Sequence, residues 1–243
     1  MSADVRDRFQ HRTFDDPETL AVAAADEFVA MVKAKSGDFH VALSGGSTPK
    51  KLFDVLANRG KAAVPWDRVV LWWGDERCVP PDDPDSNYGM TKQHLIDPLG
   101  LDPARIHRLE GERPPIEAAA DYERALVGVL GAPPVFDLVW LGMGPDGHTA
   151  SLFPNSPGVK DRSSYVIANA VDSPLTKGPT TRLTITLGVI DAARHVRFLV
   201  TGQDKATTLA NVQNGPTEMH PSSLVTGSDT LWLIDRAAGT YLL

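Results

Sequence analysis

The chain has 243 residues, 42% of them hydrophobic and 23% charged, and its 31 acidic and 24 basic side chains give a formal net charge of -7. This composition is typical of a globular protein and excludes the disordered, fibrous and disulfide-stapled classes. Because the balance is acidic and no stretch is dense in lysine and arginine, we expect no nucleic-acid partner.

Cysteine usage and hydropathy indicate the compartment. Cys78 is the only cysteine, so neither an internal disulfide nor a four-cysteine zinc site can form. The charged N-terminus lacks the apolar stretch of a secretory signal, and no stretch approaches the ~18 consecutive apolar residues of a membrane span. We therefore expect a cytoplasmic monomer without membrane contact, folded as one domain over residues 1–243.

Helical and strand patterns alternate along the first half of the chain. Asp15 or Asp16 can cap the first helix, and Pro17 suits its first helical position. An apolar run without alternation, VVLWW, is typical of a strand covered on both faces. The elements predicted here are a helix over 16–36, a strand over 39–44, a helix over 49–59, a strand over 69–73 and a helix over 88–96.

The second half continues the alternation. Strands alternating with helices predict a doubly wound, mostly parallel α/β sheet with helices on both faces, a Rossmann-like arrangement. Ligands of such sheets bind beyond the carboxyl ends of the strands, and the clusters of Gly, Asp, His and Arg in this chain follow predicted strands. The elements predicted here are a helix over 116–130, strands over 136–141, 165–171, 182–187 and 196–201, a helix over 204–212 and a strand over 230–234.

The first polar cluster, LSGGSTPKKL, follows a predicted strand. Gly45 and Gly46 allow the backbone to approach a ligand closely. Ser47 or Thr48 can cap the next helix, and the amides at its start can bind an anion such as phosphate. The alternative is a tight strand-to-helix turn without a ligand. The terminal residues of a Walker loop and of a nucleophile elbow are missing, so neither motif is present.

The second cluster, WWGDERCVPPDDPDSNYGM, runs from a buried strand into a proline-rich loop. Asp75 can accept hydrogen bonds from sugar hydroxyls, and Arg77 can hold a phosphate with two parallel bonds. The alternative is a surface ion pair that closes the strand. Calcium binding is excluded, because Tyr88 and His94 stand where an EF-hand loop needs glycine and glutamate. We also predict that Asn87 binds the substrate.

The third cluster is GMGPDGHTASLFP. Its glycines match G-x-G-x-x-G, but Pro154 and the residues after it leave no room for the long helix of a dinucleotide site. The loop instead carries Asp146 and His148 to a strand end, where the histidine can act as a general base and the aspartate can orient it. A solvated loop histidine is the alternative. We also predict that Gly144 binds the substrate.

Two further basic residues are candidates for a phosphate site. Arg182 and Lys205 each follow a flexible stretch, and each could instead be a solvated surface charge. The other histidines show no spacing typical of metal ligands. We therefore expect no metal.

In order and spacing, the three clusters resemble the family that unites 6-phosphogluconolactonases with glucosamine-6-phosphate isomerases, over nearly the whole chain. The resemblance implies a doubly wound α/β fold that hydrolyses a small sugar phosphate lactone, 6-phosphogluconolactone, to 6-phosphogluconate in the pentose phosphate pathway without a metal or cofactor. It assigns the water-activating base to His148 and the preceding motif aspartate to Asp146. Asp75 and Arg77 match the family's Gly-Asp-Glu-Arg run.

Two other functions stay open. The related deaminases carry Phe-Asn-Glu-Pro after the histidine, with the glutamate serving proton transfer, whereas residues 151–154 here read Ser-Leu-Phe-Pro. Phe153 cannot shuttle protons, which disfavours deaminase chemistry. A sugar-phosphate sensor without turnover would carry a DNA-reading helix pair, for which the residues before 39 leave too little room.

In the expected mechanism, one set of groups binds the substrate's phosphate and another acts on the lactone carbonyl. Arg77, Lys205 and the amides near Thr48 hold the phosphate, and His148 faces the lactone carbonyl. The family often has Pro-Pro-x-Arg at the later arginine, whereas Gly-Pro-Thr-Thr precedes Arg182 here, so that arginine matches less well.

Overall fold

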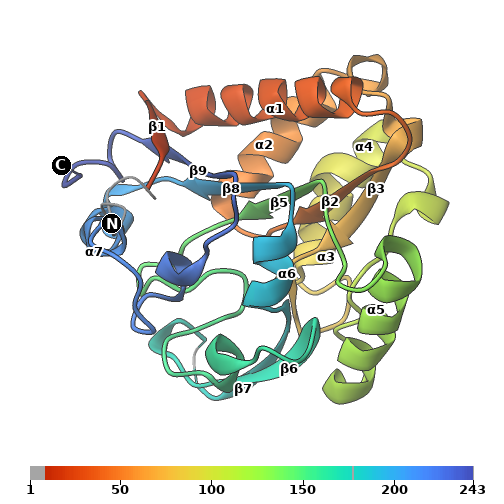
Figure 1. The fold of residues 1–243 in the computed structure, drawn as a ribbon. Helices are drawn as coiled ribbons and strands as arrows, with labels where there is room; N and C mark the ends of the chain where they lie inside the picture. Colours follow the sequence, from red (N-terminus) through yellow and green to blue (C-terminus); the bar gives the residue numbers. More distant parts are fainter. Residues whose placement is uncertain (1–8, 177, 243) are drawn as a thin grey trace.

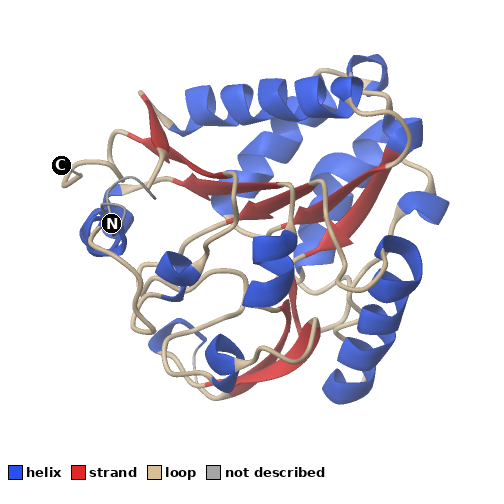
Figure 2. Ribbon diagram, viewed as in Figure 1, coloured by secondary structure: helices blue, strands red, loops and turns tan. Residues whose placement is uncertain are grey.

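A six-stranded sheet forms the centre of the molecule, and every neighbouring pair of its strands is parallel. The computed structural model describes residues 9–176 and 178–242 of the chain. Figure 1 and Figure 2 show helices on both faces of this sheet, which confirms the predicted doubly wound, mostly parallel α/β fold. In spatial order the strands are β1 (His11–Phe14), β9 (Thr230–Asp235), β8 (His195–Val200), β5 (Leu138–Leu141), β2 (Phe39–Leu43) and β3 (Val69–Trp73).

Local sequence explains how the first helix begins. The carboxylate of Asp16 accepts a hydrogen bond from the Thr19 backbone N–H at 2.8 Å, and the Thr19 side chain completes a capping box. Pro17 takes the first helical position, as predicted. The helix, α1 (Pro17–Ala34), packs beside α2 (Ser47–Asn58) on one face of the sheet, the upper one in Figure 1.

A second, smaller sheet is antiparallel and lies below the first in Figure 2. Its strands are β4 (Asp75–Arg77), β7 (Thr180–Ile185) and β6 (Val166–Val171). Gly74 joins the two sheets: its N–H donates to the Leu43 carbonyl at 2.8 Å, and its own carbonyl accepts from the Ile185 N–H at 2.9 Å. The chain therefore passes from one sheet to the other within a single residue.

The remaining helices cover the sheets and their edges. α5 (Pro115–Leu130) packs on the small sheet, where its Glu123 accepts hydrogen bonds from the backbone N–H groups of Tyr165 at 2.7 Å and Val166 at 2.9 Å. Buried side chains from both sheets belong to one hydrophobic core. The further helices are α3 (Asn87–Thr91), a π-helical turn over Lys92–Ile96, α4 (Asp97–Leu99), α5 (Pro115–Leu130), α6 (Leu187–Ala192) and α7 (Ala206–Gln213).

Two strands and one α-helix, β1, β4 and α6, have no counterpart in the sequence prediction, and α4 extends the helix predicted over 88–96. β1 is a four-residue edge strand, mostly exposed and polar, so it carries no apolar pattern. β4 consists of Asp75, Glu76 and Arg77 and is a strand only because it pairs with β7, about a hundred residues later in the chain. α6 spans residues 187–192, so it begins at the residue where a strand was predicted to end.

Within 9–176 and 178–242, no helix combines the length and the apolar character that a membrane crossing requires. The same residues include no group of three or more His, Cys, Asp or Glu side chains that could hold a metal ion.

Candidate active site

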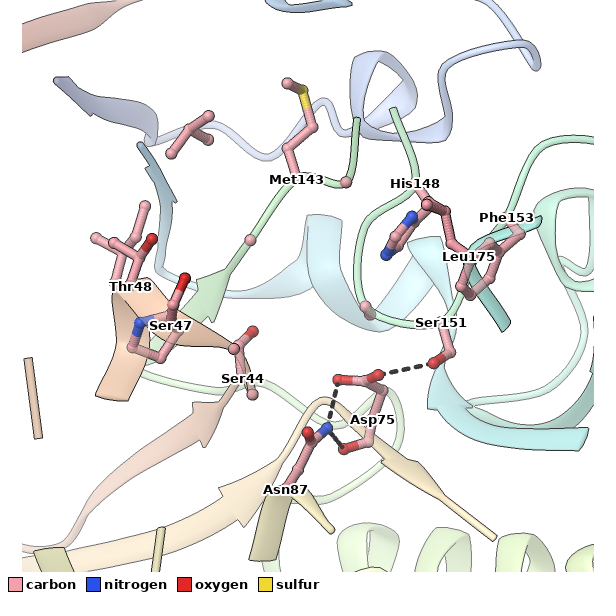
Figure 3. A pocket seen from close by; sticks show the side chains of 18 of the residues that line it. Ser44, Ser47, Thr48, Asp75, Asn87, Met143, His148, Ser151, Phe153 and Leu175 are labelled. Carbon is pink, nitrogen blue, oxygen red and sulfur yellow. Dashed lines mark hydrogen bonds between the residues drawn. The ribbon is translucent and has the colours of Figure 1, made fainter. Parts of the chain in front are cut away.

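A cavity of about 290 Å³ opens at the carboxyl ends of β2, β3, β5 and β8, between the large and the small sheet. Ligands of α/β sheets bind at such strand ends. Figure 3 shows side chains from several segments converging on it. Among the predicted site residues, all except Asp146 line the cavity: Gly45, Gly46, Ser47, Thr48, Asp75, Arg77, Asn87, Gly144, His148, Arg182 and Lys205.

The imidazole of His148 enters the cavity from the loop after β5 (Figure 3). Its Nδ1 lies 2.6 Å from Oδ1 of Asp146, which also accepts from the His148 backbone N–H at 3.0 Å. Burial opposes ionisation of Asp146, but the hydrogen bond and the charge of His148 outweigh burial and lower the pKa of Asp146. Because a carboxylate only accepts, Nδ1 carries a proton, and in the neutral imidazole the lone pair is therefore on Nε2.

Glycine is required in the loop that carries this imidazole. A Cβ atom on Gly144 would lie 2.1 Å from Nδ1 of His148 and 2.2 Å from its Cε1. Gly147 turns the chain with a φ of +83°, and its N–H donates to the Gly144 carbonyl at 2.9 Å. The next helical element after this loop in the described chain is only a turn of 3-10 helix over Pro157–Lys160. The glycines shape a tight loop, which agrees with the exclusion of a dinucleotide site.

Asp75 lies on the cavity wall, held by two polar side chains (Figure 3). Ser151 Oγ donates to its Oδ2 at 2.7 Å, and Asn87 Nδ2 donates to its backbone carbonyl at 2.9 Å and to Oδ1 at 3.3 Å. Gly45 makes room for this arrangement, since a Cβ there would lie 1.8 Å from Asn87 Oδ1. The close approach predicted at Gly45 is therefore to a side chain of the protein itself.

Glu76 fixes the segment that carries Asn87. Its carboxylate is 2% exposed and accepts from the backbone N–H groups of Arg77 at 2.7 Å, Asn87 at 2.8 Å and Tyr88 at 2.8 Å. Burial raises the pKa of Glu76, and these N–H donors act in the opposite direction. Glu76 does not line the cavity, so it supports the site by holding the backbone of residues that do.

Two guanidinium groups come together at one side of the cavity. Arg77 and Arg182 are directly opposite in the antiparallel pairing of β4 with β7. Arg77 Nη1 donates to the Asp85 carbonyl at 2.5 Å, whereas the buried Nε of Arg182 has no hydrogen-bond partner in the described part of the chain. Burial lowers the pKa of Arg182, and the charge of Arg77 adds to the shift. Lys205, which pairs with Asp204, lines the same cavity, so the site offers three cationic groups to an anion.

The turn before α2 differs from its prediction in one respect. The N-cap is Gly46, with a φ of +108°, and no side chain caps the helix. The prediction that Ser47 or Thr48 caps was wrong, because the helix already begins at Ser47, and the Thr48 hydroxyl instead lies 2.8 Å from that of Thr201. The first amides of α2 still have no partner within the helix and border the cavity.

Several lining residues were not predicted. Thr201 could have been found, because it ends a predicted strand, which is where binding residues gather. Leu175 and Thr176 lie between β6 and β7, and nothing in their local sequence indicates that this segment reaches the cavity. In the sequence, Phe153 served only as an argument against deaminase chemistry. In the structure its ring lies against that of His148, with ring centroids 4.1 Å apart. The lining residues without a sequence prediction are Ser44, Pro49, Gly142, Met143, Ala150, Ser151, Phe153, Leu175, Thr176, Leu199, Val200 and Thr201.

Comparison with known proteins gives consistent matches. Residues 15–232 match the family model described as glucosamine-6-phosphate isomerases/6-phosphogluconolactonase. A 6-phosphogluconolactonase of Haemophilus influenzae is 39% identical over 88% of this chain and 91% of its own. A solved structure described as devB protein has a TM-score of 0.88 at 33% identity and covers 97% of this chain and 100% of its own. The 6-phosphogluconolactonase from Trypanosoma cruzi has a TM-score of 0.85 at 29% identity, over 96% of this chain and 97% of its own. The chain therefore belongs to the glucosamine-6-phosphate isomerase/6-phosphogluconolactonase family.

Proposed function

We propose that this protein hydrolyses 6-phospho-D-glucono-1,5-lactone to 6-phospho-D-gluconate, in the oxidative branch of the pentose phosphate pathway. One observation carries the proposal: a carboxylate-oriented imidazole, His148, shares a cavity with two guanidinium groups, Arg77 and Arg182. A base together with anion-binding charges suits a substrate that has a reactive carbonyl and a phosphate. Relatives named 6-phosphogluconolactonase support the same choice.

In the proposed reaction, the phosphate binds Arg77, Arg182 and Lys205, near the first amides of α2. Nε2 of His148 takes a proton from water as the water oxygen attacks C1 of the lactone, and Asp146 stabilises the imidazolium. The ring C–O bond then breaks, and the imidazolium returns the proton to the departing ring oxygen. Backbone amides of the glycine-rich loops are the candidate donors to the C1 oxyanion.

Asp75 is proposed as the third residue of the catalytic group. Its carboxylate is 7% exposed and keeps unused lone pairs beside the Ser151 and Asn87 contacts. We assign it to accept hydrogen bonds from sugar hydroxyls, which orients the ring with respect to His148.

The test is a coupled assay of lactone disappearance at low temperature, corrected for spontaneous hydrolysis. We expect His148→Ala to lower kcat by roughly a hundred- to ten-thousand-fold while KM stays nearly unchanged, because the loss is confined to the transition state. The matched control is His94→Ala. His94 lies 2.7 Å from Asp54, a similar pair outside the cavity, and its removal should leave kcat unchanged.

Two outcomes would contradict the proposal. Release of ammonia from glucosamine 6-phosphate, with no lactone hydrolysis, would assign the deaminase reaction. Tight binding of sugar phosphates with no turnover of either substrate would assign a sensor.

A different outcome would contradict only the mechanism. Near-normal kcat in His148→Ala would remove that residue from the role of base, even if the wild type is a lactonase.

A further inference from the structure

Asp146 and Phe153, both in the loop that follows β5, hold the imidazole of His148, one at an edge and the other on a face. At the edge, Nδ1 lies 2.6 Å from Oδ1 of Asp146. On the face, the ring of Phe153 is stacked with an interplanar angle of 17° and a centroid distance of 4.1 Å, and Figure 3 shows the two rings together. Phe153 is only 6% exposed although it lines the cavity.

A single hydrogen bond cannot fix the plane of a ring. The bond between Nδ1 and Asp146 positions one atom of His148, and combined rotations about the Cα–Cβ and Cβ–Cγ bonds can still pivot the imidazole about that contact. A pivot would swing Nε2, which lies on the far side of the ring from Cγ, away from its direction in the cavity. The stacked ring of Phe153 opposes this rotation, because the pivot would break the contact between the two faces.

The part of this loop that carries Phe153 is anchored to the small sheet. Ser151, two residues before Phe153, donates to Asp75 through its hydroxyl at 2.7 Å and to the Thr184 hydroxyl through its backbone N–H at 3.2 Å. The carbonyl of Ser151 accepts from Asn169 Nδ2 at 2.8 Å. These partners belong to β4, β7 and β6, so the small sheet fixes the segment directly before Phe153, and the phenyl ring supports the imidazole from there.

We propose that Phe153 is a positioning residue for the reaction: by stacking on His148 it fixes the plane in which Nε2 meets the attacking water. The inference rests on the proposed lactone hydrolysis and adds a part to it. Phe153 moves no proton and touches no reacting atom. Its contribution is to keep the base aligned, and misalignment by about 1 Å can cost on the order of a hundred-fold in rate.

The kinetic test compares Phe153→Leu with Phe153→Tyr. We expect Phe153→Leu to lower kcat about ten- to hundred-fold with KM changed less than about two-fold, since the phosphate contacts are untouched. Phe153→Tyr keeps the stacking face and should stay within about three-fold of the wild-type kcat. Equal losses in both variants, or a rise in KM alone, would overturn the inference.

A double-mutant cycle separates positioning from a general packing role. If Phe153 acts through the imidazole, Phe153→Leu should cause no further loss in a protein that already carries His148→Ala. Losses that multiply would overturn the inference. Phe136→Leu is the matched control, because Phe136 is fully buried against Trp72 and outside the cavity. It should lower the thermal midpoint and leave kcat unchanged.

A spectroscopic readout keeps this inference distinct from the proposed function. The Hε1 proton of His148, identified by its loss in His148→Ala, belongs to a ring that is stacked on the phenyl group, so we expect its NMR signal to be shielded in the wild type. Phe153→Leu should move this NMR signal downfield, whereas Phe136→Leu should not. If the wild type shows no lactonase activity, the proposed function fails, and the NMR signal alone then decides whether Phe153 positions the ring. An unchanged signal in Phe153→Leu would overturn the inference whatever the activity.

Discussion

Among single side chains, Arg182 combines an unpaired polar atom with a neighbour of the same charge. Its half-buried guanidinium faces Arg77 across two paired strands, and its Nε has no hydrogen-bond partner in the described residues. Like charges directly opposite are unfavourable. A phosphate between the two groups would turn that repulsion into two charge-assisted contacts, so the free protein is arranged for an anion.

We expect Arg182→Ala to raise KM about ten- to hundred-fold with little change in kcat, because the contact holds substrate before and during the reaction. Inorganic phosphate should raise the thermal midpoint of the wild type and do so much less in the variant. Arg124→Ala, which removes an exposed ion pair with Asp121, is the control and should leave both quantities unchanged. A fall in kcat alone would reassign Arg182 to the transition state.

For the secondary-structure elements, the start of α1 gives a test of pH dependence. Hydrogen bonds from the backbone and side chain of Thr19 lower the pKa of Asp16 from its ordinary value of 3.8. A carboxylate with a lowered folded-state pKa contributes stability above its unfolded value and loses it as the pH falls through the folded-state value.

We therefore expect Asp16→Ala to lower the thermal midpoint at pH 7 by roughly 2 to 4 °C, and the difference from wild type to shrink below pH 3.8. Asp16→Asn keeps a capping acceptor without the charge, so its thermal midpoint at pH 7 should lie between those of the wild type and Asp16→Ala. Thermal unfolding followed by circular dichroism measures all three proteins. A difference that is constant with pH would show that the ionised carboxylate is not what stabilises the helix.

Elements set by nearby residues could be predicted from the sequence, and elements set by distant pairing could not. The cap at Asp16 and the buried run of β3 depend on neighbours in the chain and were correct. The contact of His148 with Asp146 spans two residues, so its proximity also followed from the sequence. By contrast, β4 is polar and exists through its pairing with β7, so it was taken for a loop. The stacking of Phe153 depends on the path of a turn that no local pattern encodes.

At the scale of the whole molecule, we propose that both sheets form one domain. Leu183 and Ile185 of the small sheet are fully buried and belong to the same hydrophobic core as Trp73 and Leu43 of the large one. We also propose a cytoplasmic monomer that takes a small sugar phosphate and binds neither membrane nor nucleic acid. Light scattering tests the mass, and a stable dimer would contradict it.

One domain should unfold in one transition. We expect circular dichroism and tryptophan fluorescence to give the same thermal midpoint, and Leu183→Ala to cost about 2 to 5 kcal/mol while keeping a single transition. Leu183 tests the small sheet because its side chain is fully buried there. A separate, earlier transition in that variant would show that the small sheet melts on its own.

The passage of the chain through Gly74 has a bearing on how this protein could change over evolution. Successive side chains of a strand point to opposite faces, so a slip of β7 by one residue would turn Arg182 away from Arg77 without altering either amino acid. The bond between Gly74 and Ile185 sets that alignment immediately beside the large sheet. Insertions in the segment between β6 and β7 can therefore be absorbed as loop length. A single insertion between Gly74 and Arg77 would instead turn Arg77 away from Arg182 and so break up this pair of cationic side chains.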